Sequence, residues 1–258
     1  MAEPSALRVE DRDDGVRVLT LSNPARRNAL DDAQVARLDE ALASAPGVAR
    51  AVLLQGEGGA FCSGYDLNQL SAPRGDVLPD DVLMACLARL EALPLPSVAL
   101  VRGAAFGAGF DLASACDFRV GGEDALFSMP PARLGIVYSP DGLARAARLV
   151  GVARAKNLFL TGRRLEGREA LAWGLLDECL PPAEAWPRAL ALCQTLAAQA
   201  PLAVAGMKEA FRLLSRPALS GEEQARLREL RARAFASEDA REGRAAFLEK
   251  RPPRFQGR

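Results

Sequence analysis

The sequence predicts an α/β fold in which a sheet of buried strands is followed by a helical C-terminal section. Residues 51–55 and 97–101 form short, continuous apolar runs, which are typical of strands covered on both faces. Segments with apolar residues at helical spacing lie between these runs, so strands and helices alternate along the first half of the chain. From residue 142 to residue 247 the pattern is mostly helical.

The first half of the chain contains one further predicted strand and two predicted helices. Residues 16–21 alternate between apolar and polar side chains, which indicates a half-buried strand. Asp31 or Asp32 can cap the first helix, and Asp80 can start the second, which ends before Pro94. The apolar residues at helical spacing are Val35, Leu38 and Leu42 in the first helix and Leu83, Leu87 and Leu90 in the second.

The second half is predicted to hold short strands before and within the helical region. Residues 118–120 and 125–127 are the first two strand candidates, and residues 175–180 interrupt the helices with a third. Asp141 is interpreted as a cap of the helix that follows it.

Length and composition favour a globular protein that acts on small molecules. With 258 residues, 49% of them apolar, the chain can form one large core, and we expect a core domain over residues 1–200 and a helical section over 201–258. Lys and Arg number 33, and so do Asp and Glu, which indicates neither a nucleic-acid partner nor a membrane surface. Residues 1–14 are polar, and no run of about 18 apolar residues occurs, so we expect a cytoplasmic protein.

The residue types that are missing exclude several kinds of site. The chain has no histidine, which excludes a Ser-His-Asp triad, a Cys-His dyad and an HExxH zinc site. Its five cysteines are far apart and form no CxxC pair, which argues against a disulfide framework or a zinc site. We therefore expect no metal, and any proton transfer must use another side chain or the substrate.

Two glycine-rich turns follow predicted strands, at residues 56–67 and 102–111. A turn that opens into a helix presents amides with no intrahelical acceptor, and such amides can hold a negative oxygen. The second turn lacks the third glycine of GxGxxG, and no glycine precedes a Lys-Ser or Lys-Thr pair, so neither dinucleotide nor P-loop binding is predicted. The two turns together indicate an anion hole.

Four motifs resemble the enoyl-CoA hydratase/isomerase family, also called crotonases, in order and spacing over almost the whole chain. They are PARRNAL at 24–30, AFCSGYDL at 60–67, RGAAFGAGFD at 102–111 and FLEKRPPRF at 247–255. The resemblance implies a spiral of ββα units with a helical C-terminal section for oligomerisation. It also implies a homotrimer or a dimer of trimers, in which apolar positions such as Leu227, Leu230, Ala234 and Phe235 pack between subunits.

The resemblance further implies an acyl-CoA substrate, with coenzyme A as part of the substrate and no separate cofactor. In the family pattern the backbone N–H groups of Tyr65 and Ala108 form the oxyanion hole, and Ala108 replaces the usual glycine. Two such donors stabilise an enolate oxygen more than a neutral carbonyl. The residues that the resemblance assigns to coenzyme A are Arg26, Arg27, Ala29, Ser63, Asp66 and Leu67, together with Lys250 from a neighbouring subunit.

The chain departs from the hydratase pattern at both catalytic glutamates. Asp111 stands at the position of the first and is shorter by one C–C bond, about 1.5 Å, and Pro131 stands at the position of the second. Two-carboxylate hydration is therefore disfavoured. In the LGIVY turn, Tyr138 resembles a tyrosine of the methylmalonyl-CoA decarboxylases, a subgroup that also has an acid in the preceding glycine cluster.

Each of these two side chains also has a structural interpretation. Tyr138 can be a half-buried packing residue, and Asp111 can be a first-turn acid favoured by the helix dipole. The preferred hypothesis is a decarboxylase-type lyase with Tyr65, Ala108, Asp111 and Tyr138 at its catalytic site. The alternatives are an enoyl-CoA hydratase or isomerase that uses Asp111, and a non-catalytic acyl-CoA binding protein, which would bind the thioester but form no product.

Overall fold

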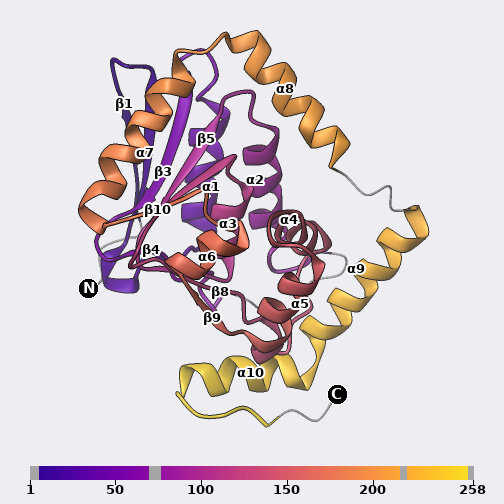
Figure 1. Ribbon diagram of the computed structural model, residues 1–258. Helices are drawn as coiled ribbons and strands as arrows, with labels where there is room; N and C mark the ends of the chain where they lie inside the picture. The colour runs from indigo at the N-terminus through magenta and orange to yellow at the C-terminus, as the bar shows by residue number, and fades with distance from the viewer. Residues whose placement is uncertain (1–5, 70–76, 216–219, 255–258) are drawn as a thin grey trace.

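The computed structural model describes residues 6–69, 77–215 and 220–254, and its centre is a six-stranded sheet (Figure 1). Its strands, in spatial order, are β1 (Ala6–Asp11), β2 (Val16–Ser22), β3 (Ala51–Gly56), β5 (Ser97–Val101), β7 (Phe118–Gly122) and β10 (Glu178–Leu180). β1 is antiparallel to β2, and the other pairs are parallel. Parallel strands need crossover connections, and the helices that supply them cover the sheet.

A second, four-stranded sheet lies at one end of the first. It contains β4 (Ala60–Cys62), β6 (Ala104–Phe106), β8 (Leu126–Ser128) and β9 (Arg164–Glu166), in that order. The chain passes from one sheet to the other and then into a helix three times, through α2 (Asp81–Ala92), α3 (Ala108–Ala115) and, after η2 (Pro131–Leu134), α4 (Pro140–Val150). This repetition confirms the predicted spiral of ββα units.

The remaining helices surround this core (Figure 1). Before the first of the three passages lie η1 (Pro24–Arg26) and α1 (Asp32–Ala43). After them come α5 (Val152–Thr161), α6 (Gly167–Trp173), α7 (Pro182–Ala197), α8 (Pro201–Leu214), α9 (Gly221–Ala236) and α10 (Glu238–Leu248). Among the described residues no single helix is long and apolar enough to cross a membrane; α7 and α8 meet that measure only as a pair, which is bent by 106°.

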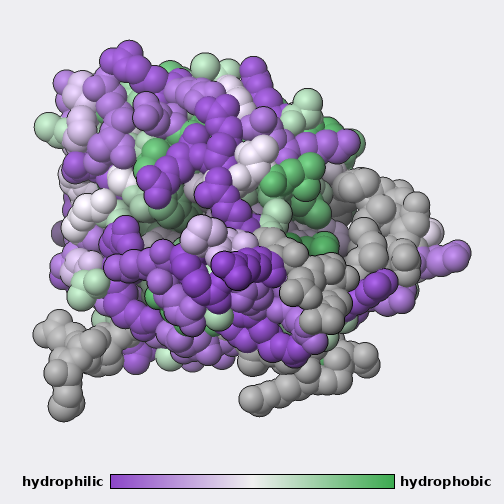
Figure 2. Space-filling view, turned by 90° about the horizontal axis from the view of Figure 1, so that it is seen from below, coloured by the Kyte–Doolittle hydropathy of each residue, from purple (hydrophilic) through white to green (hydrophobic). Residues whose placement is uncertain are grey.

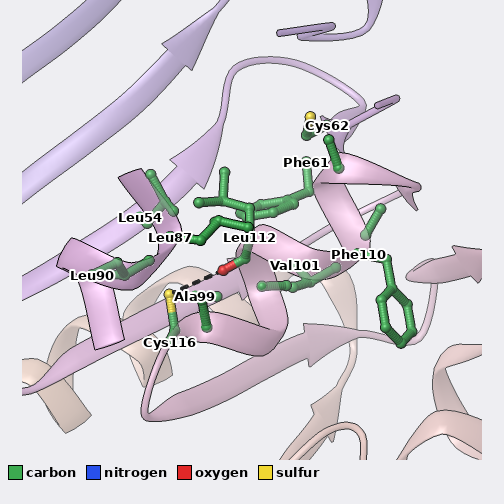
Figure 3. Packing of buried hydrophobic residues seen from close by; sticks show 14 of the residues in the cluster. Leu54, Phe61, Cys62, Leu87, Leu90, Ala99, Val101, Phe110, Leu112 and Cys116 are labelled. Carbon is green, nitrogen blue, oxygen red and sulfur yellow. Dashed lines mark hydrogen bonds between the residues drawn. The ribbon is translucent and has the colours of Figure 1, made fainter. Parts of the chain in front are cut away.

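The hydrophobic core has one part on each face of the large sheet. On one face, residues of β3, β5 and the second sheet pack against α1, α2 and α3; Figure 3 shows Leu54, Leu87 and Leu112 among them. On the other face, Ala185, Ala189 and Cys193 of α7 pack against the opposite sides of the same strands. Both faces of the central strands are thus covered, as their continuous apolar runs predict.

Two predictions about local structure are corrected. Residues 16–21 are buried throughout, not half-buried, because the core covers both faces of β2: Leu19 and Leu21 pack in the part that includes α1, and Val16 and Val18 in the part that includes α7. The buried Arg17 bonds to the Asp11 carboxylate at 2.6 and 2.8 Å and to the Ala41 carbonyl at 2.9 Å. The cap of α4 is Ser139, whose hydroxyl accepts from the Gly142 amide at 3.0 Å, and not Asp141, which lies in the first turn.

The C-terminal helices extend along one side of the core (Figure 1). Lys208 on α8 joins them to it by donating to the Leu95 carbonyl at 2.7 Å and by pairing with Asp117. Phe235 was predicted to pack between subunits, but it is already buried against Leu78 of its own chain. The side chains of Leu227 and Leu230 lie outside the described residues, and the trimer and the domain boundary at residue 200 stay predictions.

Candidate active site

A cavity of about 780 Å³ lies where the loops after β4, β6 and η2 meet the C-terminal helices. The loops contribute Tyr65 and Tyr138, the first residue of α3 contributes Ala108, and α9 contributes Phe235. Figure 2 shows the molecule from below, where polar side chains predominate over α10 and apolar ones gather in small patches. Of the eleven residues assigned to the site from the sequence, the cavity lining includes nine: Arg26, Arg27, Ala29, Ser63, Tyr65, Asp66, Leu67, Ala108 and Tyr138.

The two predicted oxyanion donors come from separate strand ends. Tyr65 follows Gly64, whose φ of +115° is accessible to glycine and whose added Cβ would meet the Phe106 carbonyl at 3.2 Å. Ala108 is the first residue of α3, so its amide has no acceptor within the helix. In the described part of the chain neither amide donates a hydrogen bond to the protein, and both residues line the cavity. This pair of donors can hold one anionic oxygen.

The loop that presents Tyr65 is held by the segment after η1. The Leu30 amide donates to the Gly64 carbonyl at 2.8 Å, and the Asp66 amide donates back to the Leu30 carbonyl at 2.7 Å. Asn28 is buried; its side-chain nitrogen donates to the Ala60 carbonyl at 2.7 Å and to the Glu57 carbonyl at 2.9 Å. The first two motifs of the sequence are therefore joined by hydrogen bonds into one wall of the cavity.

Asp111 lies behind the cavity wall, in a buried ion pair that the sequence did not predict. Arg145 on α4 donates from Nε to Asp111 Oδ1 at 2.8 Å and from Nη2 to Oδ2 at 3.1 Å. Both side chains are buried, with 0% of Asp111 and 3% of Arg145 exposed. Arg145 Nη1 also donates to Glu91 on α2 at 2.5 Å. Both carboxylate oxygens of Asp111 thus accept hydrogen bonds from a buried side chain of the protein.

Tyr138 connects this ion pair to the cavity. Its hydroxyl donates to Asp111 Oδ2 at 3.0 Å, while the residue itself lines the cavity. Burial, and then the negative charge of Asp111, hold the pKa of Tyr138 well above its usual value, so the phenol keeps its proton. Gly142 leaves room for the ring, because an added Cβ would lie 2.4 Å from Tyr138 Cε1.

The residues assigned to coenzyme A divide into two groups. Arg26 and Arg27 line the cavity, and Arg26 pairs with Asp66 at 2.8 Å. Lys250 is exposed and is not part of the described cavity lining, although the next residue, Arg251, is. A contact between Lys250 and a substrate held by another subunit stays a prediction.

Two buried thiols, one at the end of β4 and one at the end of α3, are unsuited to nucleophilic catalysis. Cys62 and Cys116 are buried free thiols, and burial raises the pKa of each to about 12. A thiol with such a pKa supplies almost no thiolate at neutral pH.

Comparison with known proteins identifies the class of this α/β protein. A family model described as enoyl-CoA hydratase/isomerase matches residues 11–258. A probable enoyl-CoA hydratase of Bacillus subtilis (strain 168) is 37% identical over 254 residues, which cover 95% of this chain and 96% of that protein. The 2,3-dehydroadipyl-CoA hydratase of Escherichia coli (strain K12) is 36% identical over 252 residues, which cover 97% and 98%.

A solved structure is similar over the same extent. Methylmalonyl-CoA decarboxylase complexed with 2S-carboxypropyl-CoA superimposes with a TM-score of 0.90 at 28% identity, covering 98% of each chain. The fold and these matches define an enzyme class that acts on acyl-CoA thioesters. This chain belongs to the enoyl-CoA hydratase/isomerase family.

Proposed function

We propose that this enzyme is an acyl-CoA decarboxylase, which removes CO₂ from a malonyl-type thioester and stabilises the resulting enolate. The observation that supports this most directly is the position of Asp111. Both of its oxygens bind Arg145, and it is absent from the described cavity lining, so it cannot readily activate water there. Pro131 stands at the position of the second glutamate of the hydratases. Hydration of an enoyl thioester would therefore lack both of its usual carboxylates at the acyl group.

Decarboxylation makes fewer demands on the protein. The electrons of the breaking C–C bond pass through the α carbon to the thioester oxygen, CO₂ leaves, and the enolate then takes up one proton at the α carbon. The amides of Tyr65 and Ala108 are the donors for the developing oxyanion. Apolar side chains of the cavity lining, among them Leu83, Met129, Ile136 and Phe235, provide surroundings that favour loss of a desolvated carboxylate.

Tyr138 is suited to orient the acyl group opposite the two amides. Its single hydroxyl proton bonds to Asp111, and rotation about the C–O bond can redirect that proton to a substrate oxygen. Asp111 then still accepts both bonds from Arg145, so no buried charge is left unpaired. The ion pair between Asp111 and Arg145 thus positions the Tyr138 hydroxyl at the cavity.

Hydration is the second candidate, favoured by the names of the relatives. The proteins that are 36–37% identical include two hydratases, whereas the decarboxylase structure is 28% identical. For either reaction we propose that the coenzyme A part of the substrate binds Arg26, Arg27 and neighbouring residues of the cavity mouth, where cations suit phosphate groups.

Tyr138→Phe tests the role of the hydroxyl. We expect kcat for CO₂ release from methylmalonyl-CoA to fall by about 10–150-fold, because a hydrogen bond to a charged group contributes about 1.5–3 kcal/mol. The free energy of unfolding should fall by about 1.5–3 kcal/mol, because the hydroxyl also donates to the buried Asp111 carboxylate, while the ring still packs and Asp111 keeps Arg145. Steady-state kinetics and urea denaturation measure the two effects, and an unchanged kcat would limit Tyr138 to packing.

A further inference from the structure

A carboxyl group without a role in the proposed function so far lines the same cavity. Asp80 is the residue before α2, at the position from which side chains usually cap a helix. Its side chain makes no capping hydrogen bond; the neighbouring Asp81 instead accepts from the Leu78 amide at 2.8 Å. Asp80 is 6% exposed and belongs to the cavity lining, whereas Asp81 does not.

Two described residues of the cavity lining carry carboxyl groups, Asp66 and Asp80. Asp66 pairs with Arg26 among the residues proposed for coenzyme A, and the hydrogen bond from this guanidinium helps to hold the pKa of Asp66 low. Asp80 belongs to the same lining but is not among the residues proposed for coenzyme A. Burial is the main cause of the raised pKa of both Tyr65 and Tyr138, and the ionised form of Asp80 adds to it, so Asp80 lies within electrostatic range of both phenol groups in the cavity that all three residues line.

Tyr138 itself is a poor source of the proton that the enolate needs. Its pKa is well above the ordinary value for tyrosine, and its conjugate base would lie beside the buried Asp111 charge. A carboxyl group is the stronger acid, and proton transfer by a positioned acid contributes about 10²–10⁴-fold to a rate.

We infer that Asp80 is the catalytic acid that delivers a proton to the α carbon of the thioester enolate, an inference that rests on the proposed formation of that enolate. The enolate π electrons form the new C–H bond with the Asp80 proton, the C=O of the thioester reforms, and Asp80 is left as a carboxylate that solvent reprotonates. In reverse, the Asp80 carboxylate removes an α proton from the product thioester. The enzyme then exchanges the α hydrogens of a thioester that has no carboxylate to lose.

The test is deuterium uptake by propionyl-CoA in D₂O, followed by mass spectrometry. The parent enzyme should exchange the α hydrogens, and Asp80→Asn should slow this exchange by about 100-fold or more. Asp80→Glu, which keeps a carboxyl group, should retain more exchange than the amide variant. Asp81→Asn removes the adjacent carboxylate outside the cavity lining and is the matched control, expected to exchange at the parental rate.

The outcomes separate this inference from the proposed function. Exchange that depends on Asp80, with no CO₂ release from methylmalonyl-CoA, would support the acid and refute the decarboxylase. No exchange by the parent enzyme, or equal exchange by Asp80→Asn with an unchanged melting temperature, would overturn the role of Asp80. If Asp80→Asn fails to fold, Asp80→Ser, which also lacks a carboxyl group, replaces it in the test. Exchange slowed by about 100-fold or more in folded Asp80→Ser is the expected result, and a parental rate in that variant would overturn the role of Asp80.

Discussion

Arg145→Met is expected to lower the free energy of unfolding by about 3–5 kcal/mol, the usual cost of removing one partner of a buried ion pair. The substitution leaves the Asp111 carboxylate, with 0% exposed, facing an apolar side chain. It also removes a partner of Glu91. Urea denaturation followed by circular dichroism measures the change.

Two further variants control for the loss of packing and of surface charge. The double variant Arg145→Met with Asp111→Leu leaves no carboxylate at this position and should recover much of the lost stability. Arg148→Met removes the other cation bound to Glu91, but this pair is more exposed, so its cost should be about 0–1 kcal/mol. A loss below about 1 kcal/mol in Arg145→Met would contradict a strong dependence on the buried pair.

Ala108→Pro is expected to lower kcat by about 10²–10³-fold, because it deletes one oxyanion donor. Ala108 is the first residue of α3, where proline is well tolerated since its missing N–H has no helical acceptor. The fold should therefore survive, which circular dichroism can check. Steady-state kinetics then report the effect of the lost N–H group.

Ala108→Gly is the matched control for this substitution. It keeps the N–H group and restores the residue usual in the family, so kcat should stay within about threefold of the parent, a change of about 0.7 kcal/mol. A folded Ala108→Pro variant with parental kcat would show that this amide does not hold the reacting oxygen.

The strands and helices of the core were largely predictable because burial on both faces leaves a clear apolar pattern. β3 and β5 follow from continuous apolar runs, and α1 follows from its apolar face and its cap, Asp31. β1 and β9 were missed since an edge strand with exposed polar side chains has the composition of a loop. The burial of β2 was not predicted because Arg17 is polar, and a polar residue in a strand usually indicates an exposed face. Arg17 is buried here because Asp11 pairs with its charge.

The cavity was predictable where the chemistry belongs to the backbone. The glycine turns indicated an anion hole, the family resemblance assigned it to the amides of Tyr65 and Ala108, and the structure places both residues on one cavity. Arg145 was missed because an arginine in an amphipathic helix is usually solvated, and its partner lies 34 positions earlier in the chain. Asp80 was interpreted as the start of a helix, and only the cavity shows where it lies.

The central claim is tested most directly by assaying one enzyme preparation for two reactions: CO₂ release from methylmalonyl-CoA and hydration of crotonyl-CoA. We expect kcat/KM for decarboxylation to exceed that for hydration by at least about tenfold, a difference of about 1.4 kcal/mol between the two barriers. Efficient hydration of crotonyl-CoA without CO₂ release from methylmalonyl-CoA would contradict the decarboxylase assignment.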